Sequence, residues 1–432
     1  MGAFRRGLVW TFRRITGVYF REIEVLGEAP SKDTRGRLFV SNHVNAIVDP
    51  ILVLTTAPCD ISPVAKATLW KVPGLRWLLE AVDAVQIVRR ADDPTKQGGS
   101  NDAVFDRIAS WLGGGGNILI FPEGTSHNEP HLVELKTGAA RMLLRAVEAG
   151  EGRRAGRLTF QSVALEFDAR EKFRSRALLI YGPVRDASDF TERGDAFVTA
   201  VTARIREDLS ELLVEAATWD ERRLIARVAS MLAHDAGDPT LAGWSAIGRQ
   251  VGAARRMLAG DPDTVETIRA RVDAYYKKLD DLGLEDADIA GPRPRATASL
   301  LRKLYLLSTL PFAAAGYVLY SVPYWIVASI AGRVKSGDET STIKLGAGLV
   351  LYPLWCAALV TVSLIVAPRP WSFALAALAL ISPFSAVSWR DATPELRRSL
   401  RALFRGEKLD EARAARAAAM EPIKAAQARL GL

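Results

Sequence analysis

A histidine and an aspartate stand six positions apart in the stretch SNHVNAIVDP, residues 41–50. An imidazole held by a carboxylate through one ring nitrogen can act as a general base through the other. Partners on one helix face each other at a spacing of three or four residues, so a turn must lie between His43 and Asp49. Proline favours the first turn of a helix and aspartate favours the position before it, so we expect Asp49 to be an N-cap. The alternative is a surface histidine beside an ordinary helix cap.

A second group of polar residues follows an apolar run in the stretch FPEGTSH, residues 121–127. Glu123 is ionisable, and Gly124 allows positive φ and close approach of the backbone. Exposed amides in such a turn can bind an anion. The plainer alternative is a turn that only ends a strand.

Scattered cations near expected strand ends form a third group: Arg89, Arg90, Lys136, Arg174 and Arg176. Guanidinium groups match the geometry of phosphate, so these residues are candidates for binding a phosphorylated substrate. Each of them taken alone could equally be a solvated surface charge.

The sequence around these residues alternates between strand-like and helix-like patterns of apolar residues. Strands are expected at 21–28, 37–43, 84–90, 117–124, 157–167 and 177–184, and helices after Pro50 and at 101–112 and 136–150. Alternating strands and helices predict an α/β domain with a sheet flanked by helices. The candidate residues follow strands, at the sheet edge where α/β sites usually form.

In chain order, NHVNAIVDP, VQIVRR, FPEGTSH and SVALEF resemble the motifs of the glycerolipid acyltransferases, over roughly residues 20–185. Two departures stand out. Five residues rather than the usual four separate His43 from Asp49, and Ala164 replaces a usual proline. The longer spacing, together with KFRSRA at 172–177, is similar to the fungal-type subgroup, which acylates glycerol-3-phosphate or dihydroxyacetone phosphate and carries C-terminal membrane segments.

The resemblance implies transfer of a fatty acyl group from acyl-CoA or acyl carrier protein to the 1-hydroxyl of glycerol-3-phosphate, the first step of phosphatidic acid synthesis. His43 would be the general base and Asp49 its orienting carboxylate, without an enzyme nucleophile, cofactor or metal. Arg89 would bind the acceptor phosphate. The substrate-binding residues that it implies are Arg89, Arg90, Glu123, Gly124, Thr125, Lys136, Arg174 and Arg176.

Three other functions are alternatives to this one. Acylation of lysophosphatidic acid uses the same chemistry on a different acceptor, and a non-catalytic membrane lipid-binding protein could keep the same fold. A serine hydrolase lacks support because no G-x-S-x-G stretch is present. The net charge of +8 is too modest to indicate nucleic-acid binding, and no zinc-finger spacing accompanies it.

Three long uncharged runs, at 304–332, 345–367 and 371–389, predict an integral membrane protein. The flanks at 333–344 and 390–408 are basic, so we expect both, and the catalytic domain, on the cytoplasmic face. Because Pro311 and Pro323 interrupt the first run, a re-entrant form is expected there. Core helices of a soluble domain are the alternative.

The expected division of the chain has five parts. They are an amphipathic interfacial helix at 1–20 with its arginines on lipid headgroups, an acyltransferase α/β domain at 21–215, a helical connector at 216–300, membrane-embedded helices at 301–390, and a basic, alanine-rich helical tail at 391–432. No catalytic constellation is expected in 205–290. His127, His131 and His234 are interpreted as surface or supporting residues.

Overall fold

The computed structural model describes residues 2–72, 74–88, 102–150, 157–290, 296–334, 337–403 and 406–431. The chain divides into two compact units. Unit 1 comprises Met1–Ala217 and Ser336–Thr342, and unit 2 comprises Thr218–Lys335 and Ile343–Leu432. Unit 1 is therefore built from two segments that are distant in the sequence.

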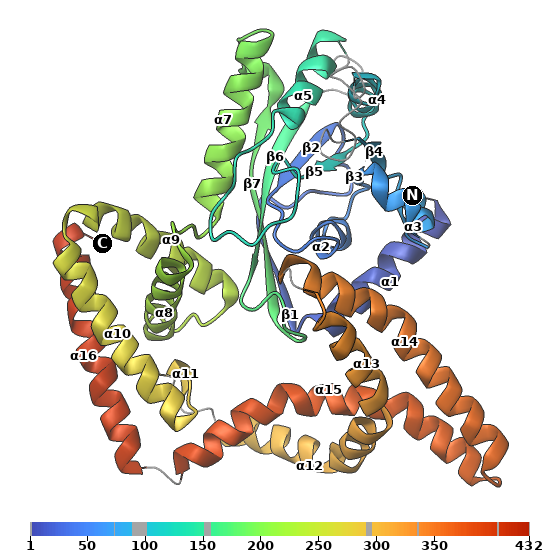
Figure 1. The fold of residues 1–432 in the computed structure, drawn as a ribbon, viewed down its shortest axis with the longest axis vertical. Coiled ribbons are helices and arrows are strands. Elements are labelled where there is room, and N and C mark those ends of the chain that lie inside the picture. Colours follow the sequence, from blue (N-terminus) through green and yellow to red (C-terminus); the bar gives the residue numbers. More distant parts are fainter. Residues whose placement is uncertain are drawn as a thin grey trace. The chain divides into compact units, whose positions relative to one another are not determined.

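A mixed sheet forms the centre of unit 1 (Figure 1). The order across it is β1-β7-β6-β2-β5-β3-β4. Strands β2 to β6 run parallel to one another, β7 is antiparallel to β6, and β1 is parallel to β7. The strands are β1 (Glu22–Gly27), β2 (Arg37–Ser41), β3 (Ser62–Lys66), β4 (Val85–Ile87), β5 (Ile118–Ile120), β6 (Thr159–Phe167) and β7 (Arg176–Asp186).

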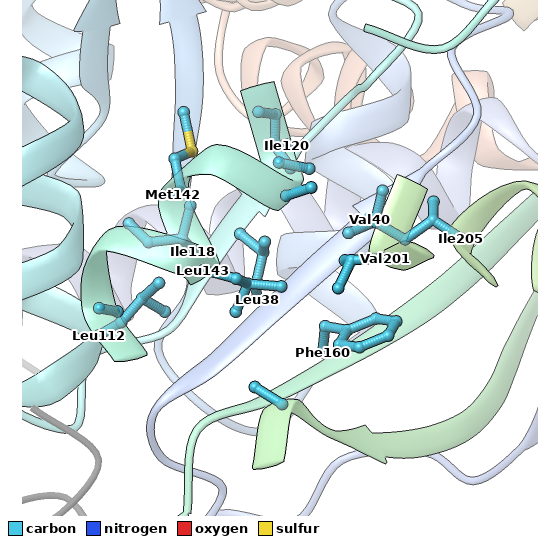
Figure 2. Packing of buried hydrophobic residues seen from close by; sticks show 14 of the residues in the cluster. Leu38, Val40, Leu112, Ile118, Ile120, Met142, Leu143, Phe160, Val201 and Ile205 are labelled. Atoms are coloured by element: carbon cyan, nitrogen blue, oxygen red, sulfur yellow. The ribbon is translucent and has the colours of Figure 1, made fainter. Parts of the chain in front are cut away.

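One face of this sheet is covered by α4 (Asp102–Gly113), α5 (Gly138–Glu148) and α7 (Asp195–Leu212). Figure 2 shows Leu38 and Val40 of β2 among side chains from these helices. Successive residues of a strand face opposite sides, so Phe39 between them lies on the other face. There its ring contacts Tyr181, whose hydroxyl lies 3.3 Å from Thr56 of α2 (Val48–Thr56). The sheet is therefore flanked by helices, as predicted.

The first helix, α1 (Ala3–Tyr19), packs against unit 1 by one side and exposes the other. Arg5 donates to Asp83 Oδ2 and to the Ile61 carbonyl, both at 2.6 Å, and Arg13 donates to the Thr55 carbonyl at 2.8 Å. The prediction that the arginines lie on headgroups is wrong for Arg5, which is buried against oxygens of the domain, whereas Arg13 is exposed and its contact with headgroups stays a prediction. Phe4 and Trp10 remain exposed. Insertion of those side chains into a membrane interface stays a prediction.

Short elements complete unit 1: η1 (Ala67–Lys71), α3 (Leu75–Ala81) and η2 (Ala187–Asp189). Strand β3 has no counterpart in the sequence prediction. Its sequence, SPVAK, contains a proline and a lysine and shows no clear alternation, so only its pairing with β4 and β5 reveals it.

Unit 2 contains a helical bundle built from α8 (Trp219–Asp235), α9 (Leu241–Met257), α10 (Pro262–Leu282), α11 (Asp286–Ala290) and α16 (Gly406–Leu430), with η3 (Leu258–Gly260) between α9 and α10. Side chains of Thr218, Thr240 and Asp261 accept from backbone amides and begin the first three of these helices. Helix α16, the predicted tail, packs along α10 and contributes Ala412, Ala419 and other residues to their common core.

The apolar part of unit 2 comprises α12 (Ala296–Leu319), α13 (Ser321–Ala331), most of α14 (Gly337–Val366) and α15 (Trp371–Leu403). The residues of α14 up to Thr342 belong to unit 1. Within the described residues, Glu339–Val366 and Trp371–Pro394 are long and apolar enough to cross a membrane. The first apolar run forms a bent pair, Leu304–Leu319 and Ser321–Ala331, with a 54° angle between the two helices. This geometry suits a broken span or a re-entrant loop, so the re-entrant form stays a prediction.

Candidate active site

The loop after β2 brings His43 and Asp49 together, as the sequence led us to expect. His43 Nδ1 lies 3.0 Å from Asp49 Oδ2, and the same oxygen accepts the backbone N–H groups of Val44 at 2.8 Å and Asn45 at 2.7 Å. The Asp49 side chain is fully buried. Three donors on one buried oxygen fix both the loop and the imidazole.

The prediction that Asp49 is the N-cap of α2 is wrong. The helix begins at Val48, its N-cap is Ile47, and no side chain caps it. Asp49 lies inside the first turn and directs its carboxylate back to the amides of the preceding loop. Pro50 then occupies the third helical position, where a backbone N–H would have no helical partner in any case.

Two contacts orient the imidazole of His43, one at the edge of the ring and one at its face. It stacks on Phe121, with ring centroids 4.1 Å apart and an interplanar angle of 21°. Because a carboxylate only accepts, the hydrogen-bond network assigns the proton to Nδ1 and leaves the lone pair on Nε2. The ring is 18% exposed, so part of it is open to solvent.

Glu123 joins the second motif to the first. Strands β2 and β5 are parallel neighbours with Val40 opposite Ile120, so the residues after both strands share one sheet edge. Glu123 Oε2 accepts the backbone N–H of His43 at 2.6 Å, and the side chain is fully buried. The structure therefore gives Glu123 a positioning role behind the His43 loop, while direct contact with substrate stays a prediction.

His127 also joins Glu123 to the His43 loop. Its Nδ1 accepts the backbone N–H of Glu129 at 3.1 Å, so the proton is on Nε2, which lies 2.9 Å from Glu123 Oε1. That separation is an ion-pair distance without the angle of a hydrogen bond. The backbone N–H of His127 also donates to the His43 carbonyl at 3.1 Å. His127 is thus a supporting residue of the His43 loop, and His131 is exposed.

The rest of the second motif forms a turn. Gly124 has φ of +75°, as predicted, and an added Cβ would meet Lys136 Cγ at 3.6 Å. The Lys136 backbone N–H donates to the Pro122 carbonyl at 2.7 Å, while its ammonium lies 3.4 Å from Glu134 in an exposed position. Thr125 is exposed. Substrate binding by these residues stays a prediction.

Two of the predicted phosphate ligands are engaged by the protein itself. Arg174 Nη1 donates to the carbonyls of Gly17, Val18 and Phe20 at 2.8 to 3.1 Å, which closes the end of α1. Arg176 binds Asp168 through its backbone N–H at 2.8 Å and through Nε at 3.0 Å. These contacts make both arginines anchors of unit 1. Arg89 and Arg90 lie outside the described residues.

Arg170 and the segment 336–342 were missed by the sequence analysis. Arg170 Nη1 donates to the Val44 carbonyl at 2.9 Å and lies 3.4 Å from the His127 carbonyl. Ser341 Oγ donates to the Arg170 carbonyl, and Thr342 Oγ1 accepts the Ile47 N–H at 3.1 Å. Arg170 follows the end of β6 at the same sheet edge, which was a usable signal. Thr342 is 295 positions from Ile47, and no local pattern could predict that contact.

Residues 22–165, which contain the His43 loop and the FPEGT turn, match the Acyltransferase family model. This domain belongs to the acyltransferase family. The chain is 33% identical over 141 residues to the lyso-ornithine lipid O-acyltransferase of Pseudomonas aeruginosa, covering 33% of this chain and 48% of that protein. It is 25% identical over 281 residues to glycerol-3-phosphate O-acyltransferase 2 of Saccharomyces cerevisiae, covering 62% and 37%. The chain thus spans less than half of the length of these curated relatives.

A solved structure is also similar to part of this chain. The crystal structure of the 1-acyl-sn-glycerophosphate acyltransferase PlsC from Thermotoga maritima matches with a TM-score of 0.35 and 18% identity, covering 47% of this chain and 78% of that one. Within the described residues, no group of three or more His, Cys, Asp or Glu side chains is arranged to hold a metal ion.

Proposed function

We propose that this acyltransferase moves a fatty acyl group from acyl-CoA, or from acyl carrier protein, to the 1-hydroxyl of glycerol-3-phosphate, and that it also accepts dihydroxyacetone phosphate. The observation that carries the proposal is the His43–Asp49 pair at 3.0 Å, held at a sheet edge by Glu123 and Phe121. An imidazole with one nitrogen held and the other available is suited to remove a proton from a hydroxyl group.

The chemistry follows from this geometry. His43 Nε2 takes the hydroxyl proton while the acceptor oxygen attacks the thioester carbonyl and forms the new C–O bond. Asp49, at Nδ1, stabilises the imidazolium that results. The tetrahedral intermediate then expels the thiolate, which takes the proton back from His43. The acceptor alcohol attacks directly, so the reaction needs no enzyme nucleophile, cofactor or metal.

Binding of the acceptor phosphate is assigned to Arg89, with Arg90 and Lys136 as further candidates. Guanidinium groups bind phosphate through paired hydrogen bonds. Arg174 and Arg176 are engaged by backbone carbonyls and by Asp168, so we propose that they support the site without contacting phosphate. Gly124 and Thr125 would border the acceptor.

The extent of the similarity favours glycerol-3-phosphate as the acceptor. The match to the yeast glycerol-3-phosphate acyltransferase runs over 281 residues, well beyond the acyltransferase domain, whereas the match to the lyso-ornithine lipid acyltransferase covers 141. The latter has the higher identity, and it supports the second candidate, a lysolipid acceptor such as lysophosphatidic acid. The membrane-spanning candidates and basic flanks support an integral membrane enzyme with its active site on the cytoplasmic face.

A panel of acceptors and donors tests the proposal. Purified protein in lipid nanodiscs is incubated with radiolabelled acyl-CoA or acyl carrier protein and with glycerol-3-phosphate, dihydroxyacetone phosphate, lysophosphatidic acid or lyso-ornithine lipid. We expect the highest kcat/KM with glycerol-3-phosphate. Equal or exclusive use of a lysolipid would contradict the acceptor assignment, and no transfer to any acceptor would support the non-catalytic lipid-binding alternative.

A further inference from the structure

The helical bundle of unit 2 contains a cavity that the proposed reaction does not use. It has a volume of about 520 Å³ and is lined by residues of α8, α9, α10 and α16. Its apolar walls include Leu224, Val228, Ile247, Val251, Ile268 and Ile423. Small-molecule sites typically have volumes of about 300–1,000 Å³. The pocket is partly open to solvent, so a ligand can reach its apolar walls.

The polar side chains of the cavity lining identify the chemistry of that ligand. They are Gln250, Arg255 and Gln427, so the lining holds one cation and no carboxylate. Among the described residues, the side chain that pairs with Arg255 is Glu221, whose Oε1 lies 3.1 Å from Nε. A guanidinium has five N–H donors, so a second carboxylate can bind the same group. An apolar cavity bordered by a guanidinium that has donors beyond its pair with Glu221 suits a long-chain carboxylate.

One wall of the cavity is fastened at both ends. Helix α16 contributes Ile423 to the lining, with Ala426, Gln427 and Leu430 beyond it. Before this strip Arg416 binds Asp286 at 2.8 Å, and near its end Arg429 binds Asp261 at 2.7 Å. These ion pairs hold α16 in place beside the apolar lining residues, so α16 does not collapse onto α9 and close the cavity.

We infer that this cavity binds one long-chain fatty acid, with the acyl chain among α8, α9, α10 and α16 and the carboxylate on Arg255. The volume suits a ligand of one chain, and the remaining donors of Arg255 would favour a free acid over a neutral lipid. The inference does not depend on the acceptor proposed for the His43 site.

The test uses the full chain in lipid nanodiscs and a photoactivatable palmitate with a diazirine near the chain end. After irradiation, labelled peptides are identified by mass spectrometry. We expect labelling within 224–258 and 423–430. Ala254→Trp fills the cavity and should lower that labelling about tenfold, because hydrophobic pockets discriminate strongly by size. Met257→Trp places the same side chain on an exposed position of α9 and should leave it unchanged.

Two substitutions that each remove one positive charge test whether Arg255 binds the carboxylate. Arg255→Gln should lower palmitate labelling about tenfold while leaving the probe's methyl ester unaffected, since hydrogen bonds to charged groups contribute most to such binding. Arg256→Gln, the neighbouring exposed arginine, is the control. Circular dichroism checks the fold of each variant, and Val251→Phe replaces Ala254→Trp if the latter fails to fold.

Three results would overturn the inference. The first is palmitate labelling confined to residues 304–389. The second is full labelling of the cavity in an Ala254→Trp protein that folds. The third is labelling of the cavity by a diacyl phospholipid probe but not by palmitate. Loss of the proposed function would appear separately, because acyl transfer is measured in the same preparations without the probe.

Discussion

The two units each contain a buried histidine–aspartate pair, and only one of them has the surroundings of an active site. His43 Nδ1 lies 3.0 Å from Asp49, and His234 Nδ1 lies 2.6 Å from Asp286. Both aspartates are buried, and both histidines are slightly exposed, by 18% and 16%. Distance and burial therefore do not distinguish the two pairs.

Their neighbours do. Asp49 is held by the amides of its own loop, and His43 stacks on an aromatic ring at the carboxyl edge of a sheet. Asp286 instead receives the Tyr275 hydroxyl at 2.6 Å and Arg416 Nε at 2.8 Å in addition to His234. Burial alone would raise the pKa of Asp286, but hydrogen bonds from His234, Arg416 and Tyr275 lower it below its ordinary value. This pair is a structural connection among α8, α10, α11 and α16, so of the two interpretations of His234, surface or supporting, the structure favours the supporting one.

The largest expected difference between the pairs is in catalysis. His43→Ala should lower kcat for acyl transfer by about 10² to 10⁴, because the general base is lost. His234→Ala should leave kcat within about twofold, since its imidazole only stabilises the bundle. Steady-state acylation with labelled acyl-CoA measures both, and nanodisc incorporation checks that each variant still enters membranes. Comparable losses of activity in the two variants would contradict the distinction.

Asp49→Asn tests whether the carboxylate sets the tautomer. The amide can donate to Nδ1, which would move the proton to Nε2 and remove the base. We expect kcat to fall by about 10² to 10⁴ with KM little changed, and the residual rate should rise at higher pH if hydroxide replaces the base. A pH–rate profile identical in shape and height to that of the unaltered protein would refute the role of Asp49.

Asp286→Asn should lower the stability of the fold more than the rate of acyl transfer, which is the opposite of the effect expected for Asp49→Asn. Breaking a buried ion pair costs about 3–5 kcal/mol in the free energy of unfolding. The pKa of Asp286 is lowered on folding, so its stabilisation is present above the ordinary carboxyl pKa and is lost as pH falls through the folded value. Thermal unfolding followed by circular dichroism between pH 7 and pH 3 should show less acid dependence in the variant. Asp410→Asn, in an exposed pair with Arg413, should change little.

Thr342→Val should have the smallest effect. It removes the acceptor for the Ile47 N–H and loosens the loop that carries His43. One neutral hydrogen bond contributes about 0.5–1.5 kcal/mol, so kcat should fall about twofold to tenfold with little change in KM. Thr342→Ser keeps the hydroxyl and should restore the rate. Equal rates in all three proteins would mean that this contact does not position the loop.

The sequence predicted the features that depend on local patterns and missed those that depend on distant contacts. Apolar runs and turn residues were enough to place strands such as β2 and β6 and the helix after Pro50, and motif order was enough to bring His43 near Glu123. Asp49 was assigned to the wrong cap because proline in the first turn is compatible with more than one helix start. The contacts of His234 with Asp286 and of Ile47 with Thr342 join residues far apart in the chain, so no local sequence pattern predicts them.

The contact between Ile47 and Thr342 also sets an order of events during synthesis. The His43 loop leaves the ribosome early, yet one of its partners is residue 342, which is 125 positions after Ala217, the end of the first segment of unit 1. At about 5–20 residues per second, that partner is made some 6–25 s later. The apolar run 304–332 is translated within this interval. The nascent chain therefore acquires its complete loop only after this candidate membrane segment has been synthesised, so the full rate of the proposed acyl transfer would be reached only after that point.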